Sequence, residues 1–171
     1  MNNNQRKNSK SNSDVGKEFE KNARKILEKK IGVSFAFGIP ILLGFEKKKE
    51  HKFDLGNLEK KIIVECKSHT WTESNKTPSA KMTVWNEAML YFSLCPQDVH
   101  YRKIFFVLKN FNKKKKQTLA EYYLSRYVHL IPPDVEIWEY DEKKDSVVIL
   151  KNSASPLRVH SDCIQSPSGF C

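Results

Sequence analysis

The chain has 171 residues, a formal net charge of +10, 39% hydrophobic residues and 29% charged residues. A chain of this length can bury roughly 70% of its unfolded surface, so we expect one domain whose hydrophobic core is stable without disulfides or structural metals. The sequence contains no apolar run of the ~18–20 residues that a membrane span needs, and its first residues lack the apolar stretch of a secretory signal. The four cysteines show no metal-ligand spacing, so we expect a cytoplasmic protein with free thiols and no membrane partner.

The positive charge is concentrated in parts of the chain. Residues 62–100 carry a net charge of −1, whereas residues 101–131 carry +7. Clustered Lys and Arg are typical of proteins that bind a polyanion, because their contacts with phosphates release counterions. The alternative is a surface that is generally rich in lysine and has no such partner.

The first segment, residues 1–13, contains three basic groups and no acid. Its polar composition predicts a disordered basic arm. Apolar residues at helical spacing then predict a helix over residues 14–31, which Ser13 or Asp14 can cap and Gly32 ends.

The next stretch, residues 33–45, is rich in β-branched and aromatic residues. It predicts one strand, or two short strands with a bend at Gly38–Pro40. Residues 46–52 are strongly charged and predict a loop.

Two further strands are predicted at residues 52–55 and 60–68, joined by a tight turn around Gly56-Asn57. A helix follows to about residue 94, with Pro78 at its start and Thr77 as its cap. The sequence from residue 103 onward predicts first a buried strand at 103–109 and a basic loop at 113–116. A helix then runs from a Thr118/Glu121 capping box to Tyr127. A short strand at 129–131 and a hairpin of 136–140 with 146–150 follow.

Alternating helices and strands favour an α/β fold with a central mixed sheet that helices flank on both faces. We expect this domain to cover residues 14–151, followed by a loose C-terminal tail at 152–171.

The segment KKIIVECKS contains the main chemical signal. Glu65 and Lys67 are two residues apart on a strand, so their side chains share a face. Charged groups on an apolar strand are costly unless they are paired or bound. Asp54 lies on the preceding strand, where hairpin pairing can bring its carboxylate close to Glu65. The alternative is a surface strand with a cross-strand ion pair.

Two carboxylates and an ammonium group suit phosphodiester hydrolysis. Mg²⁺ needs only one or two carboxylates together with water, and Mn²⁺ can substitute for it. The ion polarises the phosphate and activates water, and a lysine can orient that water. We therefore expect Asp54 and Glu65 to bind the metal and Lys67 to be catalytic. The pattern Glu-x-Lys occurs six times in the chain, but only the Glu65 copy follows an apolar strand and has an aspartate on a partner strand.

These residues resemble the PD-(D/E)XK nuclease motif, with Phe53 where the motif usually has proline. The segment Gly16-Lys17-Glu18-Phe19-Glu20 is similar to the G-x-x-F-E start of restriction-endonuclease-like and Holliday-junction-resolvase-like members. The resemblance covers residues 14–110 and implies a restriction-endonuclease-like αβββαβ core. It also implies that Glu20 joins the metal site as a catalytic residue, with Glu18 as the weaker competitor; the alternative is that Glu20 is an ordinary exposed acid of the helix. The resemblance further implies that the protein can form a homodimer.

Several other residues are candidates for binding the substrate. His69 continues the alternation of Glu65 and Lys67, although it can equally be a strand-end histidine bonded to backbone. Ser79 and Lys81 open a helix, whose N-terminus can bind phosphate, or they belong to an ordinary capped helix. The lysine run can grip a DNA backbone or can be a solvated loop: Lys113, Lys114, Lys115 and Lys116.

The expected function is a Mg²⁺-dependent DNA endonuclease of the restriction or defence type. One alternative is a repair or recombination nuclease that recognises DNA structure. Another is a nucleic-acid-binding module without catalysis. The presence of all three residues of the trio, Asp54, Glu65 and Lys67, argues against this alternative. We expect target recognition to come from loops at 46–52, 72–78 and 109–116, from recognition of a DNA structure such as a junction, or from a partner subunit. Cys66 and the tryptophans are expected to be core residues.

Overall fold

The computed structural model describes residues 12–72 and 77–153. In chain order, the elements are α1 (Asn12–Ile31), β1 (Ala36–Leu43), β2 (Lys49–Asn57), β3 (Ile62–Lys67), α2 (Ser79–Ser93), β4 (Arg102–Leu108), β5 (Phe111–Asn112), β6 (Gln117–Thr118), α3 (Leu119–Tyr127), the 3₁₀ helix η1 (Val128–Leu130), β7 (Val135–Asp141) and β8 (Ser146–Lys151).

Six of these strands form one mixed sheet in the order β1-β2-β3-β4-β7-β8, while β5 and β6 pair separately. The three central strands β3, β4 and β7 run parallel, and the other pairs are antiparallel. Helices α2 and α3 lie in the two connections between the parallel strands, as parallel pairing requires. The predicted α/β class with a central mixed sheet is confirmed.

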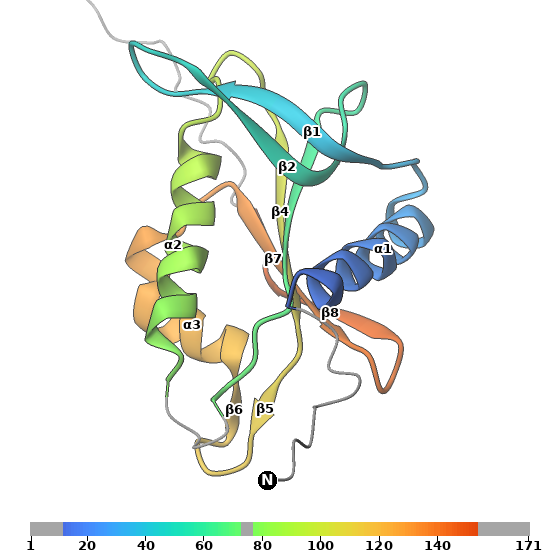
Figure 1. Cartoon of the computed structure of the whole chain (residues 1–171), viewed down its shortest axis with the longest axis vertical. Helices are drawn as coiled ribbons and strands as arrows, with labels where there is room; N and C mark the ends of the chain where they lie inside the picture. The colour runs from blue at the N-terminus through green and yellow to red at the C-terminus, as the bar shows by residue number, and fades with distance from the viewer. Residues whose placement is uncertain (1–11, 73–76, 154–171) are drawn as a thin grey trace, which may run out of the picture.

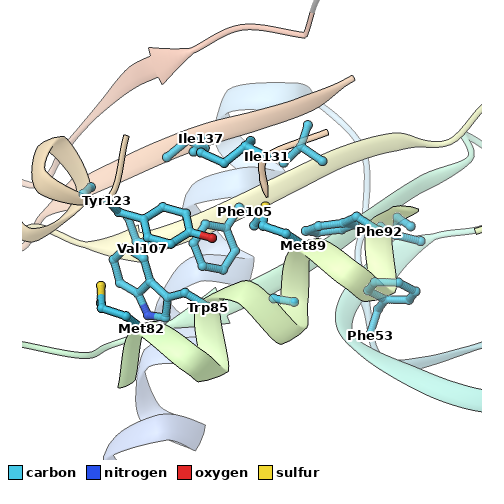
Figure 2. Close-up of a cluster of buried hydrophobic side chains, with 14 of the residues drawn as sticks. Phe53, Met82, Trp85, Met89, Phe92, Phe105, Val107, Tyr123, Ile131 and Ile137 are labelled. Atoms are coloured by element: carbon cyan, nitrogen blue, oxygen red, sulfur yellow. The ribbon is translucent and has the colours of Figure 1, made fainter. Parts of the chain in front are cut away.

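The helices cover the sheet on both faces, with α2 and α3 on one side and α1 on the other (Figure 1). On the first face, Trp85 of α2 packs edge-on against Phe105 of β4 and Tyr123 of α3, and Figure 2 shows the surrounding cluster. On the second face, Phe19 of α1 contacts Phe106 of β4. Since each such buried side chain contributes about 1.5–3 kcal/mol, the two layers hold the strands in place.

Strand β2 is longer than the sequence predicts. It begins at Lys49, inside the predicted loop 46–52, and continues through Gly56-Asn57, where a turn was expected. Pairing with the edge strand β1 orders its charged first half. Gly56 lies within the strand, and a glycine is needed there because a Cβ would lie 2.5 Å from the Ile62 carbonyl oxygen. The prediction of a turn at Gly56-Asn57 is therefore wrong.

Other boundaries also differ from the predictions. Helix α1 begins at Asn12, two residues earlier than expected. The N-cap of α2 is Pro78 instead of Thr77, and its side chain makes no capping hydrogen bond. The segment predicted as a strand at 129–131 lies mostly in the 3₁₀ helix η1. The region of Gly38–Pro40 belongs to a single strand at the sheet edge, where proline is tolerated.

Several local predictions are confirmed. Thr118 and Glu121 form the expected capping box of α3, residues 113–116 form a turn, and β7 and β8 form the expected hairpin. Residues 1–11 of the predicted arm and 154–171 of the predicted tail lie outside the described residues. Across 12–72 and 77–153, no helix has the length and apolar character to cross a bilayer.

Candidate functional site

Strand β2 changes its side-chain alternation next to β3. Phe53 packs under α2 and Leu55 packs on the α1 face, although residues two apart in a regular strand share a face. The register of β2 with β3 runs from Asn57↔Ile62 to Leu55↔Val64. Just beyond it, the backbone N–H of Cys66 donates to Asp54 Oδ2 at 2.7 Å. The Asp54 carboxylate therefore replaces a backbone acceptor, which fixes it beside β3.

Strand β3 brings the other two members of the trio to this point. The Lys67 ammonium donates to Glu65 Oε2 at 2.7 Å and lies 3.5 Å from Asp54 Oδ2. The side chain of Glu65 is only 5% exposed, whereas those of Lys67 and Asp54 are 17% and 24% exposed. The structure thus brings Asp54, Glu65 and Lys67 together at a position that solvent reaches. Their chemical roles stay predictions.

His51 is a fourth member of the cluster, which the sequence did not reveal. Its Nε2 atom lies 2.9 Å from Glu65 Oε1. The imidazole stacks on Tyr91 of α2, with 3.9 Å between ring centroids, and meets Phe53 edge-on. His51 precedes Asp54 by three residues, which places the two on opposite faces of a regular strand. Only the change of alternation in β2 brings both to one site.

The ionic states in the cluster follow from burial and from its uneven charge. Burial opposes ionisation of Glu65, but the hydrogen bond from His51 and the Lys67 charge outweigh it and lower the pKa. Burial and the Glu65 charge raise the pKa of Asp54 by more than the Lys67 charge lowers it, so the pKa is raised overall. Burial alone would lower the pKa of Lys67, but the charges of Glu65 and Asp54 raise it. The ammonium therefore stays protonated at neutral pH.

Glu20 of α1 is also close enough to influence this cluster. Burial raises its pKa first, and the charge of Asp54 raises it further. Glu18 is exposed and borders a shallow hollow with Lys17 and Lys21 on the outer side of α1. Of the two glutamates in the G-x-x-F-E segment, Glu20 is therefore the one whose charge interacts with the trio.

The composition of this cluster suits a hard divalent cation. Two carboxylates, from Asp54 and Glu65, are paired with one ammonium group, and the Glu20 carboxylate interacts with them electrostatically, so the site has an excess of negative charge. Across the described ranges, no three His, Cys, Asp or Glu side chains are already arranged to enclose a metal ion. Mg²⁺ does not need three, because it binds through one or two carboxylates and keeps several waters. Asp54 and Glu65 are the residues that would hold it.

The trio opens into a hollow between the sheet and α2. Its volume is about 230 Å³, and its walls come from β2, β3 and α2. The lining residues are His51, Asp54, Glu65, Lys67, Val84, Glu87, Ala88 and Tyr91. A ligand can therefore reach the ammonium and both carboxylates from one side.

His69 lies beyond the end of β3 and is held by α2. Its Nδ1 atom accepts a hydrogen bond from the Trp85 indole at 2.8 Å. Burial, with smaller contributions from Lys81 and Lys67, lowers the pKa of His69 to about 4. His69 is therefore neutral at physiological pH, and any contact with a phosphate would use a neutral donor. A role in substrate binding stays a prediction.

The remaining predicted substrate-binding residues lie on the surface. Ser79 and Lys81 are exposed in the first turn of α2. Lys113, Lys114, Lys115 and Lys116 are exposed in the turn between β5 and β6. Lys115 Nζ lies 5.6 Å from the ring centre of Trp71, which is itself buried. Cys66 is also buried, which raises its thiol pKa, as expected of a core residue.

A scan against protein-family models and searches of curated proteins and of solved structures each found no match.

Proposed function

We propose that this protein is a Mg²⁺-dependent nuclease that hydrolyses DNA phosphodiester bonds at the cluster of Asp54, Glu65 and Lys67. The observation that carries the proposal is that one ammonium lies 2.7 Å from Glu65 and 3.5 Å from Asp54 in a site open to ligands. The element order α1-β1-β2-β3-α2-β4 supports a restriction-endonuclease-like core, since it repeats the αβββαβ order that the motif implies.

Each side chain has a distinct task in this proposal. When bound, Mg²⁺ supplies Lewis acidity and a water of lowered pKa. Asp54 and Glu65 hold the ion through hard oxygen atoms. Lys67 is paired with both carboxylates. It orients the attacking water and stabilises negative charge that develops on the phosphate. His51 contacts Oε1 of Glu65 and Lys67 contacts Oε2. Together, the two contacts fix the orientation of the Glu65 carboxylate.

The excess of acids argues against a purely structural ion pair. A pair that serves stability alone needs equal charges, as in Arg102 and Glu136, whose guanidinium donates to both carboxylate oxygens at 2.7 and 3.1 Å. In the proposed site, Asp54 has a raised pKa in spite of the nearby lysine. Such under-compensated charge is costly to the fold, and a cation ligand would offset it.

The test is cleavage of supercoiled plasmid by the purified full chain, with Mg²⁺ or with EDTA. We expect nicked or linear DNA only with Mg²⁺, and at least ~100-fold slower cleavage by Glu65→Gln and Lys67→Met. Glu136→Gln is the matched control, because it alters a buried glutamate paired with a cation outside the site. No cleavage by wild type, or equal cleavage by the site variants, would overturn the proposal.

The products of that experiment also identify the type of nuclease. Discrete fragments would favour a restriction or defence enzyme. Cleavage confined to branched DNA would favour a repair or recombination enzyme.

A further inference from the structure

The tip of the β1–β2 hairpin, residues 44–48, has an exposed apolar residue next to a basic run. Phe45 is 87% exposed, which is the highest value among the large hydrophobic side chains that the structure describes. Lys47, Lys48 and Lys49 follow it and are also exposed. A phenylalanine in this position contributes little to the core.

The backbone of the tip has a defined shape. Gly44 adopts a φ of +131°, and a Cβ at this position would lie 2.6 Å from the Lys47 carbonyl oxygen. Only glycine fits such a turn without strain. Below the tip, β1 and β2 pair from Leu43↔Lys49 onward. Phe45 is therefore presented at the end of a regular two-stranded ribbon.

The tip and the proposed active site lie along the same helix. Residues Val84 to Tyr91 of α2 line the hollow of the active site. Ser93 and Leu94, at the end of α2, line a second hollow of about 250 Å³ together with Phe45 and Lys48 of the tip. In Figure 1 the hairpin runs across one end of the molecule, and its tip lies on the α2 side.

Strand β2 also connects the tip directly to the trio. Lys47 precedes Asp54 by seven residues, which spans at most about 23 Å at the rise of a strand. This length is about two thirds of a turn of B-DNA, or about seven base pairs. A duplex whose scissile phosphate is at Asp54 would therefore be in reach of the tip.

We propose that the β1–β2 tip binds duplex DNA, with Lys47 and Lys48 on backbone phosphates and Phe45 against the minor groove. This inference rests on the proposed function, since it takes DNA as the substrate. Two-stranded ribbons enter DNA grooves, and phenylalanine is among the side chains that wedge into the minor groove. Glu46 and Glu50 flank the lysines, and DNA is favoured over an anionic bilayer because the tip is within reach of a duplex bound at the trio.

The experiment measures binding of the full chain to a labelled duplex in EDTA, by fluorescence anisotropy over a range of salt concentrations. The double variant Lys47→Ala/Lys48→Ala is compared with Lys143→Ala/Lys144→Ala, which removes two exposed lysines from the β7–β8 turn. Each phosphate contact contributes about 0.9 to the slope of log K against log salt, so we expect the first pair to lower it by about 2 and the second to leave it unchanged.

The variant Phe45→Ala tests the apolar contact separately. We expect it to weaken DNA binding about fivefold to tenfold without a change in the salt slope, because it removes no charge. Unchanged affinity in the Phe45 and Lys47/Lys48 variants, or an equal loss in the control pair, would overturn the inference. Binding to phosphatidylserine vesicles is measured for the same variants. If they bind DNA as wild type does but lose vesicle binding that wild type shows, the inference would also be overturned, and the tip would be assigned to a membrane surface.

Cleavage by wild type in Mg²⁺ separates this inference from the proposed function. If wild type cleaves plasmid but the tip variants bind DNA with unchanged affinity, only the inference would be overturned. Tip-dependent DNA binding without any cleavage would overturn only the nuclease proposal and would support the tip contact.

Discussion

Replacing Asp54 with asparagine should make the metal-free protein more stable while it removes function. Burial and the Glu65 charge raise the pKa of Asp54, so its ionised form costs stability at neutral pH. Asparagine keeps an oxygen for the backbone N–H of Cys66 and removes the charge. Relief of the cost of burying this charge, and of its repulsion by Glu65, therefore outweighs the lost attraction to Lys67.

The magnitude follows from the same balance. Interactions of a partly exposed charge are screened by solvent and contribute at most about 1 kcal/mol, so we expect a gain of about 1 kcal/mol at pH 7. This corresponds to about 3 °C in the melting temperature of a domain of this size. An acid with a raised pKa costs stability above its unfolded value of 3.8. The gain should therefore vanish near pH 3, where both states are protonated.

Thermal unfolding in EDTA and in about 10 mM Mg²⁺ tests this reasoning. If the ion binds wild type with a dissociation constant of about 1 mM, it adds about 1.4 kcal/mol, and Asp54→Asn should lose most of this gain. Glu136→Gln, which breaks a balanced pair, should destabilise the protein in both buffers. A less stable Asp54→Asn protein in EDTA would refute the reasoning, because the trio would then be a stabilising ion pair.

Three further predictions concern neighbouring side chains. His51→Ala should weaken Mg²⁺ binding, measured by calorimetry, about tenfold or more through loss of the contact with Glu65, whereas His51→Gln should restore most of it; equal affinity of all three proteins would contradict a positioning role. Burial raises the pKa of Glu139, so the free energy of unfolding falls as pH rises above 4.5. Glu139→Gln should therefore be more stable than wild type at pH 7 and equally stable near pH 3.5 in urea unfolding, and a loss of stability at pH 7 would contradict this sign. The NMR signals of His69 should titrate near pH 4, because burial lowers its pKa; a midpoint near 6.5 would show an imidazole free of the Trp85 indole.

The sequence was sufficient to locate the trio. The apolar run before Glu65 indicated a buried strand, and strand alternation put Glu65 and Lys67 on one face. The aspartate on the preceding strand then followed from antiparallel pairing, and the structure brings all three side chains together.

The sequence could not reveal His51, because its position depends on the change of alternation in β2 at Asp54. The charged start of β2 has the composition of a loop, and only pairing with β1 makes it a strand. Similarly, η1 follows directly on α3, so its backbone continues a helical path where local composition predicts a strand. The first error arises because strand pairing overrides local preference, and the second because the chain continues a helical path from α3.

The central claim is that Asp54 and Glu65 share one metal ion in a phosphodiester-hydrolysing site. Anomalous diffraction from crystals of the full chain soaked in Mn²⁺ tests it most directly. We predict a single strong peak within about 2.0–2.3 Å of a carboxylate oxygen from each residue, and its loss in Asp54→Asn. A peak elsewhere, or none at all in a protein that still cleaves DNA, would contradict the account.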